Sequence, residues 1–594
     1  MIKTLSKYIK EYKAASVVTP FFMIFEVLME IIVPYLMASL VDNGIEANNG
    51  EGDMKHILIM GGVMLIAAVL GLMAGLMGGK YGAKASAGFA KNLREGMFNN
   101  IQTFSFSNID KYSTAGLVTR LTTDVTNVQN AYQMLLRICM RAPATLICAM
   151  AMSFIVSAKI AFIYLGAVIL LSIVLVIIML SAHKYFKKAF PMYDELNASV
   201  QENVSAIRVV KAYVREDYEK DKFKKASFKI YKLLYSAEKI LAKNNPAMMI
   251  AIYGCMLMVS WVGAKLVVGS HQTVLTTGNL TSLLTYCQSI LGSLMMLSMC
   301  FVMVSMSMAS AERISEVLNE KADIVNPKDP EYEVADGSIT FEHVDFCYKN
   351  NSGEMVLNDI NLNIRSGETI GIIGGTGSSK SSLVNLISRL YDVTGGSVKV
   401  GGKDVREYDL TTLRNQVSVV LQKNVLFSGS ILENLRWGDE DATEEECIRA
   451  CKLACADEFI EKFPDGYNTH IEQGGSNVSG GQKQRLCIAR ALLKKPKILI
   501  LDDSTSAVDT ATDARIRKAF ATEIPNTTKI IIAQRISSVC NADRIIVMDN
   551  GKINGIGTHD ELINNNEIYR DVYESQTGGG SGDFDENKSE GGAL

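Results

Sequence analysis

Long apolar stretches fill the first half of the chain, whereas short apolar runs alternate with polar segments in the second half. A helix needs about 20 apolar residues to cross a bilayer. The stretches that meet this requirement lie at roughly 16–40, 57–79, 133–157, 159–181, 244–269 and 279–306. From about residue 335 onward, strand-like runs alternate with helix-like segments, which is typical of an α/β domain. We therefore predict an α-helical membrane domain with six spans, fused to an α/β domain.

The polar segments between the spans predict the orientation. Residues 80–132 and 182–243 are long and rich in Lys and Arg, and such segments stay on the cytosolic side of a membrane. We expect them to be helical extensions of the spans, reversing near 112–116 and 206–210. They form either a solvated stalk or a pair of short helices that dock on a cytosolic motor. Six spans leave both termini cytosolic, so we expect a multi-pass protein of the cytoplasmic membrane.

Two shorter features complete the pattern. Ser157, Ala158 and Lys159 are nearly all that separates the third and fourth spans, which predicts a very short hairpin loop. Within residues 1–15, lysines face an apolar stripe, and no small-residue cleavage site follows. This arrangement predicts an interfacial elbow helix rather than a signal peptide.

Two carboxylates, Glu26 and Glu30, lie one helical turn apart inside the first span. A charge in the hydrocarbon region is costly and usually faces a cavity or a partner. One interpretation is a substrate pathway that takes cationic compounds. Another is an ion pair with Arg137, Arg141 or a neighbouring helix. A third places Glu26 nearer the lipid headgroups.

Composition excludes some classes of protein. The 594 residues contain 60 Lys and Arg against 63 Asp and Glu, and a net charge of −3 argues against a nucleic-acid partner. The eleven cysteines are odd in number and scattered, so they do not form a disulfide framework. Cys447, Cys451 and Cys455 share one helical face, which we interpret as a buried stripe rather than a metal site.

A phosphate-binding loop is predicted in the second half. The segment TIGIIGGTGSSKSSLVNLI reads as a strand, a Gly-rich loop and a helix. Backbone N–H groups of such a loop cradle phosphates, Lys380 supplies a positive charge, and Ser381 offers a hydroxyl to Mg²⁺. Ser379 stands where this pattern usually has glycine. A later apolar strand ends in Asp502, which would hold the same Mg²⁺.

Between these two elements, the segment Asn477-Val478-Ser479-Gly480-Gly481-Gln482-Lys483-Gln484-Arg485 resembles the signature motif of ATP-binding cassette (ABC) transporters. The resemblance covers the chain to about residue 575, and six spans ahead of one cassette are similar to a half-transporter of the type IV exporter class. It implies that ATP and Mg²⁺ are the cofactors and that the two reversals are coupling helices. It also implies that two cassettes pack head to tail around two ATP molecules, so that the signature of one faces the phosphates held by the other.

The resemblance assigns roles to individual residues. Tyr348 matches the aromatic residue that stacks on adenine, and Gln422 matches the glutamine that senses Mg²⁺ and contacts the membrane domain. The implied ATP-binding positions are Tyr348, Gly374, Gly375, Thr376, Gly377, Ser378, Ser379, Lys380, Ser381, Ser382 and Asp502, with Ser381, Gln422 and Asp502 at the metal. The implied signature residues are Ser479, Gly480, Gly481 and Gln482, and the D-loop residues are Ser506 and Asp509. The implied domains are an elbow helix (1–15), a transmembrane domain (16–318), a nucleotide-binding P-loop ATPase cassette (335–575) and a disordered, Gly-rich tail (576–594).

Two catalytic positions depart from the family pattern. Asp503 stands where the family usually has the glutamate that orients the attacking water, and Gln534 stands where it has the switch histidine. With Ser379, all three departures fall in the site built on this chain's own phosphate loop, whereas the signature differs only at Val478. We therefore expect a site with Asp503, Gln534 and Gln422 at the catalytic positions, degenerate because of Asp503 and Gln534, and a heterodimer whose second half-transporter carries the usual Glu and His.

The expected function is an ATPase-coupled exporter subunit that moves amphiphilic or hydrophobic compounds of the multidrug type across the lipid bilayer by alternating access. The last span is rich in Met, which suits an adaptable apolar surface, although such residues also simply pack between spans. Two alternatives remain. One is a homodimeric lipid flippase, and the other is a nucleotide-binding regulatory subunit with little hydrolysis.

Overall fold

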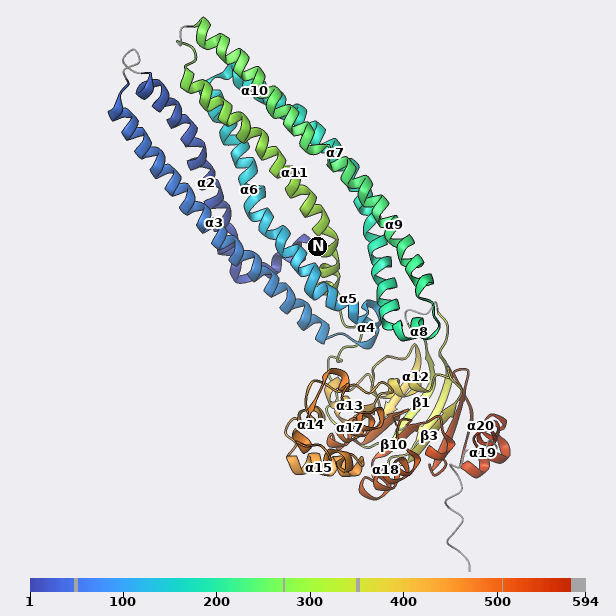
Figure 1. Ribbon diagram of the computed structural model, residues 1–594. Coiled ribbons are helices and arrows are strands. Elements are labelled where there is room, and N and C mark those ends of the chain that lie inside the picture. The colour runs from blue at the N-terminus through green and yellow to red at the C-terminus, as the bar shows by residue number, and fades with distance from the viewer. Residues whose placement is uncertain (47–51, 271–272, 349–352, 505, 578–594) are drawn as a thin grey trace, which may run out of the picture. The chain divides into compact units, whose positions relative to one another are not determined.

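The computed structural model describes residues 1–46, 52–270, 273–348, 353–504 and 506–577. Most of the tail predicted to be disordered (576–594) lies outside these ranges. The chain divides into two compact units (Figure 1). The membrane unit comprises Met1–Gln102 and Thr114–Glu320, and the cassette unit comprises Thr103–Ser113 and the chain from Lys321 onward.

The membrane unit is a bundle of long helices (Figure 1). Its helices are α1 (Ile2–Ser6), α2 (Lys13–Leu40), α3 (Met54–Gln102), α5 (Thr114–Thr119), α6 (Val125–Val156), α7 (Ala158–Ser205), α8 (Ile207–Ala212), α9 (Glu216–Leu241), α10 (Asn244–Gly269) and α11 (Thr277–Asn319). A 3-10 segment, Lys7–Tyr12, joins α1 to α2, and the backbone breaks there at Lys10. The described residues include six helical stretches that are long and apolar enough to cross a membrane, which confirms the predicted number of spans.

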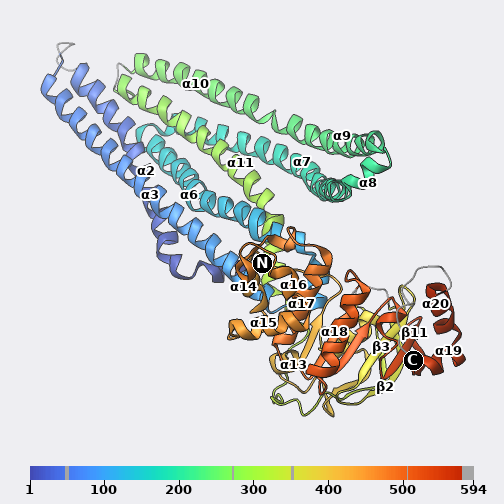
Figure 2. The same ribbon diagram turned by 60° about the horizontal axis from the view of Figure 1, so that its bottom comes forward.

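The spans continue well beyond a bilayer, as predicted. Helix α3 has 49 residues, and a helix of that length extends about 73 Å at 1.5 Å per residue, against a hydrocarbon core of about 30 Å. Helices α7 and α9 run side by side and are joined by the short helix α8 (Figure 2). Ser157 alone separates α6 from α7 and is extended, so the predicted hairpin is confirmed.

Two contacts tie α6 and its N-cap to α11. The N-cap residue Asp124 is buried, and its carboxylate accepts hydrogen bonds from Arg313 Nε (2.7 Å) and Ser310 Oγ (2.8 Å). Cys139 and Cys300 form a disulfide that the spacing along the chain does not predict, because 161 residues separate them. Polar and covalent links therefore supplement apolar packing between these two helices.

The cassette unit contains two main sheets. An antiparallel sheet has the order β2-β1-β4-β5, from β1 (Ile339–Phe346), β2 (Leu357–Ile364), β4 (Gly395–Val400) and β5 (Lys403–Asp404). A larger sheet has the order β12-β11-β3-β10-β9-β6, from β3 (Thr369–Gly374), β6 (Val417–Val420), β9 (Ile498–Asp502), β10 (Thr528–Ile532), β11 (Arg544–Asp549) and β12 (Lys552–Gly557). A short pair, β7 (Gly429–Ser430) and β8 (His470–Ile471), lies apart from both. In the larger sheet the only antiparallel pairing is between β11 and β12.

Helices surround these sheets (Figure 1). They are α4 (Phe106–Tyr112), α12 (Lys380–Ile387), α13 (Leu410–Gln416), α14 (Ile431–Leu435), α15 (Glu444–Leu453), α16 (Asp457–Ile460), α17 (Gly480–Leu493), α18 (Thr510–Glu523), α19 (His559–Asn565) and α20 (Glu567–Thr577). Cys447, Cys451 and Cys455 are all buried in one core cluster, as expected, but only the first two lie on α15. The prediction of one shared helical face is wrong for Cys455, because α15 ends at Leu453 and Cys455 has a left-handed φ of 52°.

The register of the parallel strands positions the site. Every residue of β9 and β10 is buried, which explains their nearly unbroken apolar sequences. Asp502 pairs with Ile532, and Ile532 pairs with Ile372, so β9 and β10 end at the same level and β3 ends two residues further on, at Gly374. The segments that follow these strands therefore meet at one edge of the sheet, where ligands bind in open α/β sheets.

Candidate functional site

The phosphate-binding loop connects β3 to α12. Lys380 opens the helix and folds back over the loop, where its Nζ donates hydrogen bonds to the carbonyl oxygens of Gly374 and Gly375, both at 2.8 Å. A Cβ at Gly374 would collide with the carbonyl oxygen of Met548, so glycine is required there. Gly375, Thr376 and Gly377 are exposed, and a Cβ at Gly375 or Gly377 would meet no described atom within 4 Å. The loop is therefore packed on its inner side and open on its outer side, as phosphate binding requires.

Ser379 is conformationally unusual. Its φ of 71° and ψ of 23° lie in the left-handed region, which glycine adopts without steric cost and serine does not. Serine at this position therefore makes the same turn as glycine would, but at a higher conformational energy. Ser378, next to it, is buried and its Oγ accepts a hydrogen bond from Lys380 at 3.1 Å.

Asp502 and Ser381 form the candidate Mg²⁺ site. The Ser381 Oγ donates a hydrogen bond of 3.0 Å to Asp502 Oδ1, which confirms that β9 ends against the loop. Burial, together with the nearby charge of Asp503, raises the pKa of Asp502, and burial lowers the pKa of Lys380. Among the described residues, no group of three His, Cys, Asp or Glu side chains is placed to hold a metal. This donor set fits a Mg²⁺ ion that arrives with phosphate oxygens rather than one held by protein alone.

The two catalytic departures lie in contact. Gln534 Nε2 donates a hydrogen bond of 2.8 Å to Asp503 Oδ2. Gln534 follows the end of β10 and is exposed, whereas Asp503 is half-buried at the end of β9 with a left-handed φ of 49°. The main-chain N–H of Asp503 also donates to the carbonyl of Ile532 at 3.0 Å. The amide of Gln534 thus occupies one carboxylate oxygen of Asp503.

Tyr348 lies beside the phosphate-binding helix. Its hydroxyl and the Ser382 Oγ are 2.9 Å apart and hydrogen-bonded. Tyr348 is only half-buried, so one side of the ring is accessible to a stacking base. Tyr348, which the resemblance assigns to adenine stacking, therefore lies next to the phosphate-binding helix in space, although it follows β1 of the other sheet.

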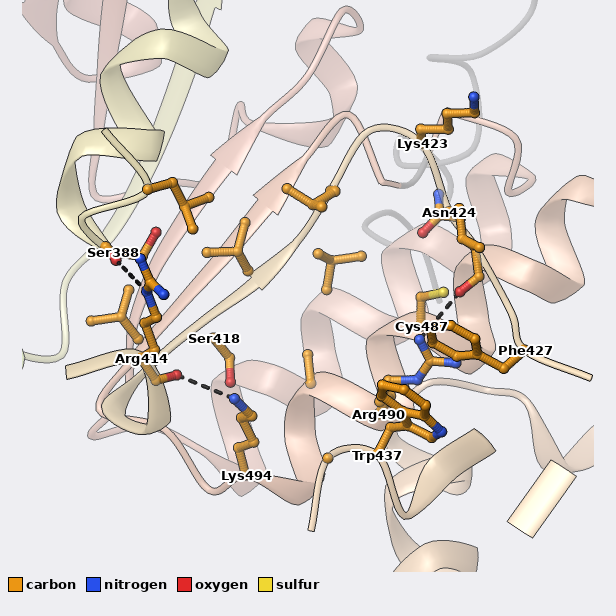
Figure 3. Close-up of a pocket in the computed structure, with 18 of the residues that line it drawn as sticks. Ser388, Arg414, Ser418, Lys423, Asn424, Phe427, Trp437, Cys487, Arg490 and Lys494 are labelled. Carbon is orange, nitrogen blue, oxygen red and sulfur yellow. Dashed lines mark hydrogen bonds between the residues drawn. The ribbon is translucent and has the colours of Figure 1, made fainter. Parts of the chain in front are cut away.

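Gln422 is exposed and follows β6, and its chain neighbours Leu421 and Lys423 line a groove of about 430 Å³. Figure 3 shows the groove walls, where the rings of Phe427 and Trp437 stack with centroids 3.9 Å apart. Arg490 donates to the carbonyls of Asn434 (2.9 Å) and Val425 (3.2 Å), which fixes the segment after Gln422. Burial lowers the pKa of Arg490 and of Lys494 on the same wall. The groove therefore combines the exposed rings of Phe427 and Trp437 with the partly buried basic side chains of Arg490 and Lys494.

The signature residues open α17 as predicted. Ser479 is the N-cap, and its Oγ accepts from the Gln482 N–H at 3.3 Å while Gln482 Oε1 accepts from the Ser479 N–H at 2.8 Å. This capping box fixes the helix start, and the first N–H groups of the helix carry its positive dipole end. Gly480 and Gly481 lie against Ala507, where a Cβ at Gly481 would be 2.7 Å from the Ala507 carbonyl oxygen.

Gln484 is a contact residue that the motif roles leave unassigned. It is buried, its Oε1 accepts from the Ala507 N–H at 3.0 Å, and its Nε2 lies 3.4 Å from Ser506 Oγ. Ser506 Oγ in turn donates to the Asp503 carbonyl at 3.0 Å. Gln484 therefore connects the signature helix to the D-loop and to Asp503. The other D-loop residue, Asp509, caps α18 by accepting from the Thr512 N–H at 2.9 Å, which holds its pKa below the usual value.

Glu26 and Glu30 lie in the membrane unit, apart from the residues above. Arg141 of α6 pairs with both, through Glu26 Oε1 at 3.2 Å and Glu30 Oε2 at 2.8 Å. The Glu30 side chain is 56% exposed and that of Glu26 is 19% exposed. Glu26 Oε2 and Arg137 Nε are buried and have no partner among the described residues. The interpretation as an ion pair with Arg141 is confirmed for both carboxylates, and of the two side chains that of Glu30 is the more exposed.

Comparisons with known proteins agree with this geometry. Residues 17–310 match the ABC transporter transmembrane region, and residues 357–506 match the ABC transporter family. The chain is 36% identical to the uncharacterized ABC transporter ATP-binding protein YfiB of Bacillus subtilis, over 97% of this chain and 99% of that protein. It is 34% identical to the uncharacterized ABC transporter ATP-binding protein Rv1273c of Mycobacterium tuberculosis, over 97% and 98% of the two chains.

A solved structure, that of a bacterial Atm1-family ABC exporter with ATP bound, has the same fold. Its TM-score is 0.83 at 23% identity, and the match covers 95% of this chain and 99% of that one. The predicted fold class, six spans fused to an α/β cassette, is therefore confirmed. Together with the loop, the buried Asp502 and the capped signature helix, these matches show that the chain belongs to the ABC transporter family, as an ATPase-coupled transporter subunit with an exporter fold.

Proposed function

We propose that this chain is one half of a heterodimeric, ATP-driven exporter, and that its own ATP site is degenerate. The observation that carries the proposal is the hydrogen bond between Gln534 Nε2 and Asp503 Oδ2. A carboxylate that orients an attacking water needs a free oxygen at the right distance. Here the side chain is one methylene shorter than glutamate, and the neutral amide of Gln534 already takes one of its oxygens. Misplacement by about 1 Å can reduce a rate by about 10²-fold.

The phosphate- and metal-binding residues of the same site support retention of bound nucleotide. Lys380 donates hydrogen bonds to three oxygens of the loop, and phosphate oxygens of a bound nucleotide could replace these acceptors. Asp502 and Ser381 would hold Mg²⁺, which shields the phosphate charges when it is bound. Burial raises the pKa of Asp502 and so disfavours its charged form, and a cation bound beside it would favour the charged carboxylate again. Tyr348 would stack on the adenine. The site is thus suited to bind ATP and poorly suited to hydrolyse it.

The signature side supports a different partner chain. Ser479 and Gln482 cap α17 without distortion, so this surface is suited to complete an active site on another cassette. Two identical copies would place Asp503 and Gln534 in both sites of the dimer. A partner with the usual Glu and His would instead give one competent site, completed by the signature of this chain.

The proposed substrates are amphiphilic or hydrophobic compounds of the multidrug type, moved out through the cytoplasmic membrane with both termini in the cytosol. Long Lys-rich extensions support this orientation. Glu30, half-exposed beside Arg141, is the part of the intramembrane cluster that supports contact with a cationic substrate.

The test is steady-state ATPase activity of the purified chain in detergent, with Lys380→Ala as background. Activity equal to the background, with a fluorescent ATP analogue still bound, supports a degenerate site. Turnover near ~1 per second would favour the homodimeric flippase instead. In the complex with a partner, replacing the partner's catalytic Glu should abolish activity. Substantial residual ATPase there would favour a regulatory subunit.

A further inference from the structure

A separate cavity of about 260 Å³, which we call the α18 pocket, lies in the cassette unit between α18 and the larger sheet. One face of α18 lines it, with residues at intervals of three and four: Ala514, Arg517, Lys518 and Ala521. The sheet contributes Thr369 and Lys529, which pair with each other near the beginning of β3 and β10. The phosphate-binding loop follows the other end of β3, about 16 Å away at about 3.3 Å per residue. The α18 pocket is therefore distinct from the candidate ATP site.

Lys529 is the unusual residue of this pocket. It is only 4% exposed and lies in a strand whose residues are all buried, where an apolar side chain is expected. Among the residues that the structure describes, none forms a hydrogen bond or an ion pair with its ammonium group. Burial lowers the pKa of Lys529, and the charge of Asp543 opposes this shift. Because a buried charge without a partner is costly, a lysine that faces a cavity in this way points to an anionic ligand.

Arg517 supplies a second positive charge from the helix. Its Nε is buried and lies 3.4 Å from Asp513 Oδ2, without the geometry of a hydrogen bond. Asp513 is itself buried, and its Oδ2 accepts a hydrogen bond of 2.9 Å from Ser538 Oγ. Asp513 thus holds one side of the guanidinium. Lys518 adds a third, exposed cation, and the described lining contains no carboxylate to balance the three.

The chemistry of the lining favours a phosphate group. A guanidinium fork and an ammonium together match a tetrahedral dianion better than a single carboxylate. Asp543 is engaged elsewhere, since its Oδ2 accepts the Thr369 N–H at 2.8 Å. The side chains of Thr369 and Asn541 add a hydroxyl and an amide, whereas Phe520 provides an apolar wall. Drug-sized ligands occupy pockets of about 300–1,000 Å³, so this smaller cavity favours a small ligand.

We propose that the α18 pocket binds a small phosphate-bearing anion, with the Lys529 ammonium and the Arg517 guanidinium as its cationic contacts. Inorganic phosphate and a phosphate monoester with a short organic group present the same dianion to these two residues. The bound anion supplies the partner that Lys529 lacks and so stabilises the packing of α18 on the sheet. This site is independent of the ATP site and of its degeneracy.

The test is equilibrium dialysis of radiolabelled inorganic phosphate against the full-length chain in detergent. A saturating non-hydrolysable ATP analogue fills the phosphate-binding loop, and the blank contains potassium chloride at the same ionic strength. We expect one phosphate to bind per chain. Lys529→Met removes the charge at similar length and should weaken binding by at least about tenfold, the ratio that corresponds to one charge-assisted hydrogen bond. Arg517→Lys keeps a positive charge beside Asp513 but loses the planar fork, and should weaken binding by about threefold.

Thermal unfolding of the same samples separates binding from folding. Without phosphate, Lys529→Met should unfold at or above the native temperature, because it removes an unpaired buried charge. Phosphate should raise the transition temperature of the native chain but not that of Lys529→Met. Lys494→Met is the matched control, because Lys494 is also half-buried but its Nζ donates to the Arg414 carbonyl at 3.2 Å. This variant should unfold earlier and bind phosphate as the native chain does.

Glycerol 3-phosphate, added as a competitor, distinguishes the two sources of the anion. Displacement at a lower concentration than unlabelled phosphate supports a monoester, and displacement only at a higher concentration supports free phosphate. No binding by the native chain above the chloride blank overturns the proposal, and so does unchanged affinity in Lys529→Met. If Lys529→Met does not fold, unchanged affinity in Arg517→Lys overturns it instead. None of these results bears on hydrolysis at the ATP site.

Discussion

Gln534 Nε2 and Asp503 Oδ2 are 2.8 Å apart, so the two residues that depart from the family's catalytic pattern are hydrogen-bonded to each other. The contact arises because β10 and β9 are parallel neighbours that end at the same level. A change at either residue therefore alters the other, and the two substitutions are coupled.

Restoring both residues should raise hydrolysis at this chain's own site. We expect Asp503→Glu combined with Gln534→His to increase turnover by about 10²-fold over the native chain, because the longer acid reaches the water and the histidine can carry positive charge. Phosphate release by the purified chain measures this. Either substitution alone should recover much less, and the double variant with Lys380→Ala is the blank. Equal gains from the single and double variants would contradict coupling.

Ser379→Gly should relieve the left-handed backbone of the phosphate-binding loop. We expect a net gain of about 0.5–1 kcal/mol in the free energy of unfolding and about threefold tighter binding of a fluorescent ATP analogue. Thermal unfolding and equilibrium titration measure the two effects. Asn550→Gly is the control, since Asn550 also has a positive φ of 43° but lies in the turn after β11. It should change stability only. An equal gain in ATP-analogue affinity in Asn550→Gly would contradict the explanation by backbone strain at Ser379.

Ser479→Ala should act on the partner's site. Loss of the N-cap costs about 1 kcal/mol and frees the first turn of α17, so we expect ATPase of the two-chain complex to fall by at least about tenfold. Thr443→Ala removes an equivalent capping box from α15, where Thr443 Oγ1 accepts from the Glu446 N–H at 3.2 Å. That control should leave ATPase unchanged. Similar losses of ATPase activity in both variants would show that the effect comes only from lost stability of the chain.

Glu368 should make the cassette sensitive to acid. Its carboxylate pairs with both Arg544 Nε and Arg544 Nη2, and this hydrogen bonding holds the pKa of Glu368 below its usual range. A lowered folded-state pKa contributes stability above the unfolded-state pKa, and that stability is lost as the pH falls through the folded-state pKa. Glu368→Gln should lower the free energy of unfolding at pH 7 by about 1–2 kcal/mol.

As the pH falls through the lowered pKa of Glu368, the difference in unfolding free energy between Glu368→Gln and the native chain should shrink, as measured by thermal unfolding across the acidic range. Glu446→Gln is the control, because Glu446 pairs with Lys495 on the exposed surface. We expect no resolvable change in the free energy of unfolding of Glu446→Gln. A difference between Glu368→Gln and the native chain that stays constant with pH would refute the linkage.

Arg141 should be essential to the membrane unit. Arg141→Met leaves Glu26 and Glu30 without their shared partner, and we expect a loss of about 2–4 kcal/mol in detergent, seen as an earlier thermal transition. Glu30→Gln should cost much less, since that side chain is 56% exposed. If Arg141→Met unfolds at the native temperature, the cluster has no structural role.

Features set by local sequence were predictable. The spans, the phosphate-binding loop and the capped signature helix each depend on residues within one short segment, and the structure forms them as expected. The packing of β9 against the loop was also predictable, because a strand of four apolar residues ending in Asp502 has few other places in a parallel sheet.

Features set by contacts between distant segments were not predictable. The pairing of Gln534 with Asp503 depends on strand order, the disulfide of Cys139 with Cys300 depends on the crossing of α6 and α11, and the buried position of Gln484 depends on the D-loop. The intramembrane carboxylates illustrate the same point. The sequence offered Arg137 and Arg141 as partners, and only the helix packing distinguishes them.

The chain crosses between the two units three times, after Gln102, after Ser113 and after Glu320. A soluble fragment that begins at Lys321 therefore lacks α4, whose Asp110 accepts a hydrogen bond of 2.7 Å from the Tyr391 hydroxyl. Kinetics measured on such a fragment would describe a cassette from which part of its own fold had been removed. A synthetic peptide of residues 103–113, added back to the fragment, is the complement that restores this contact.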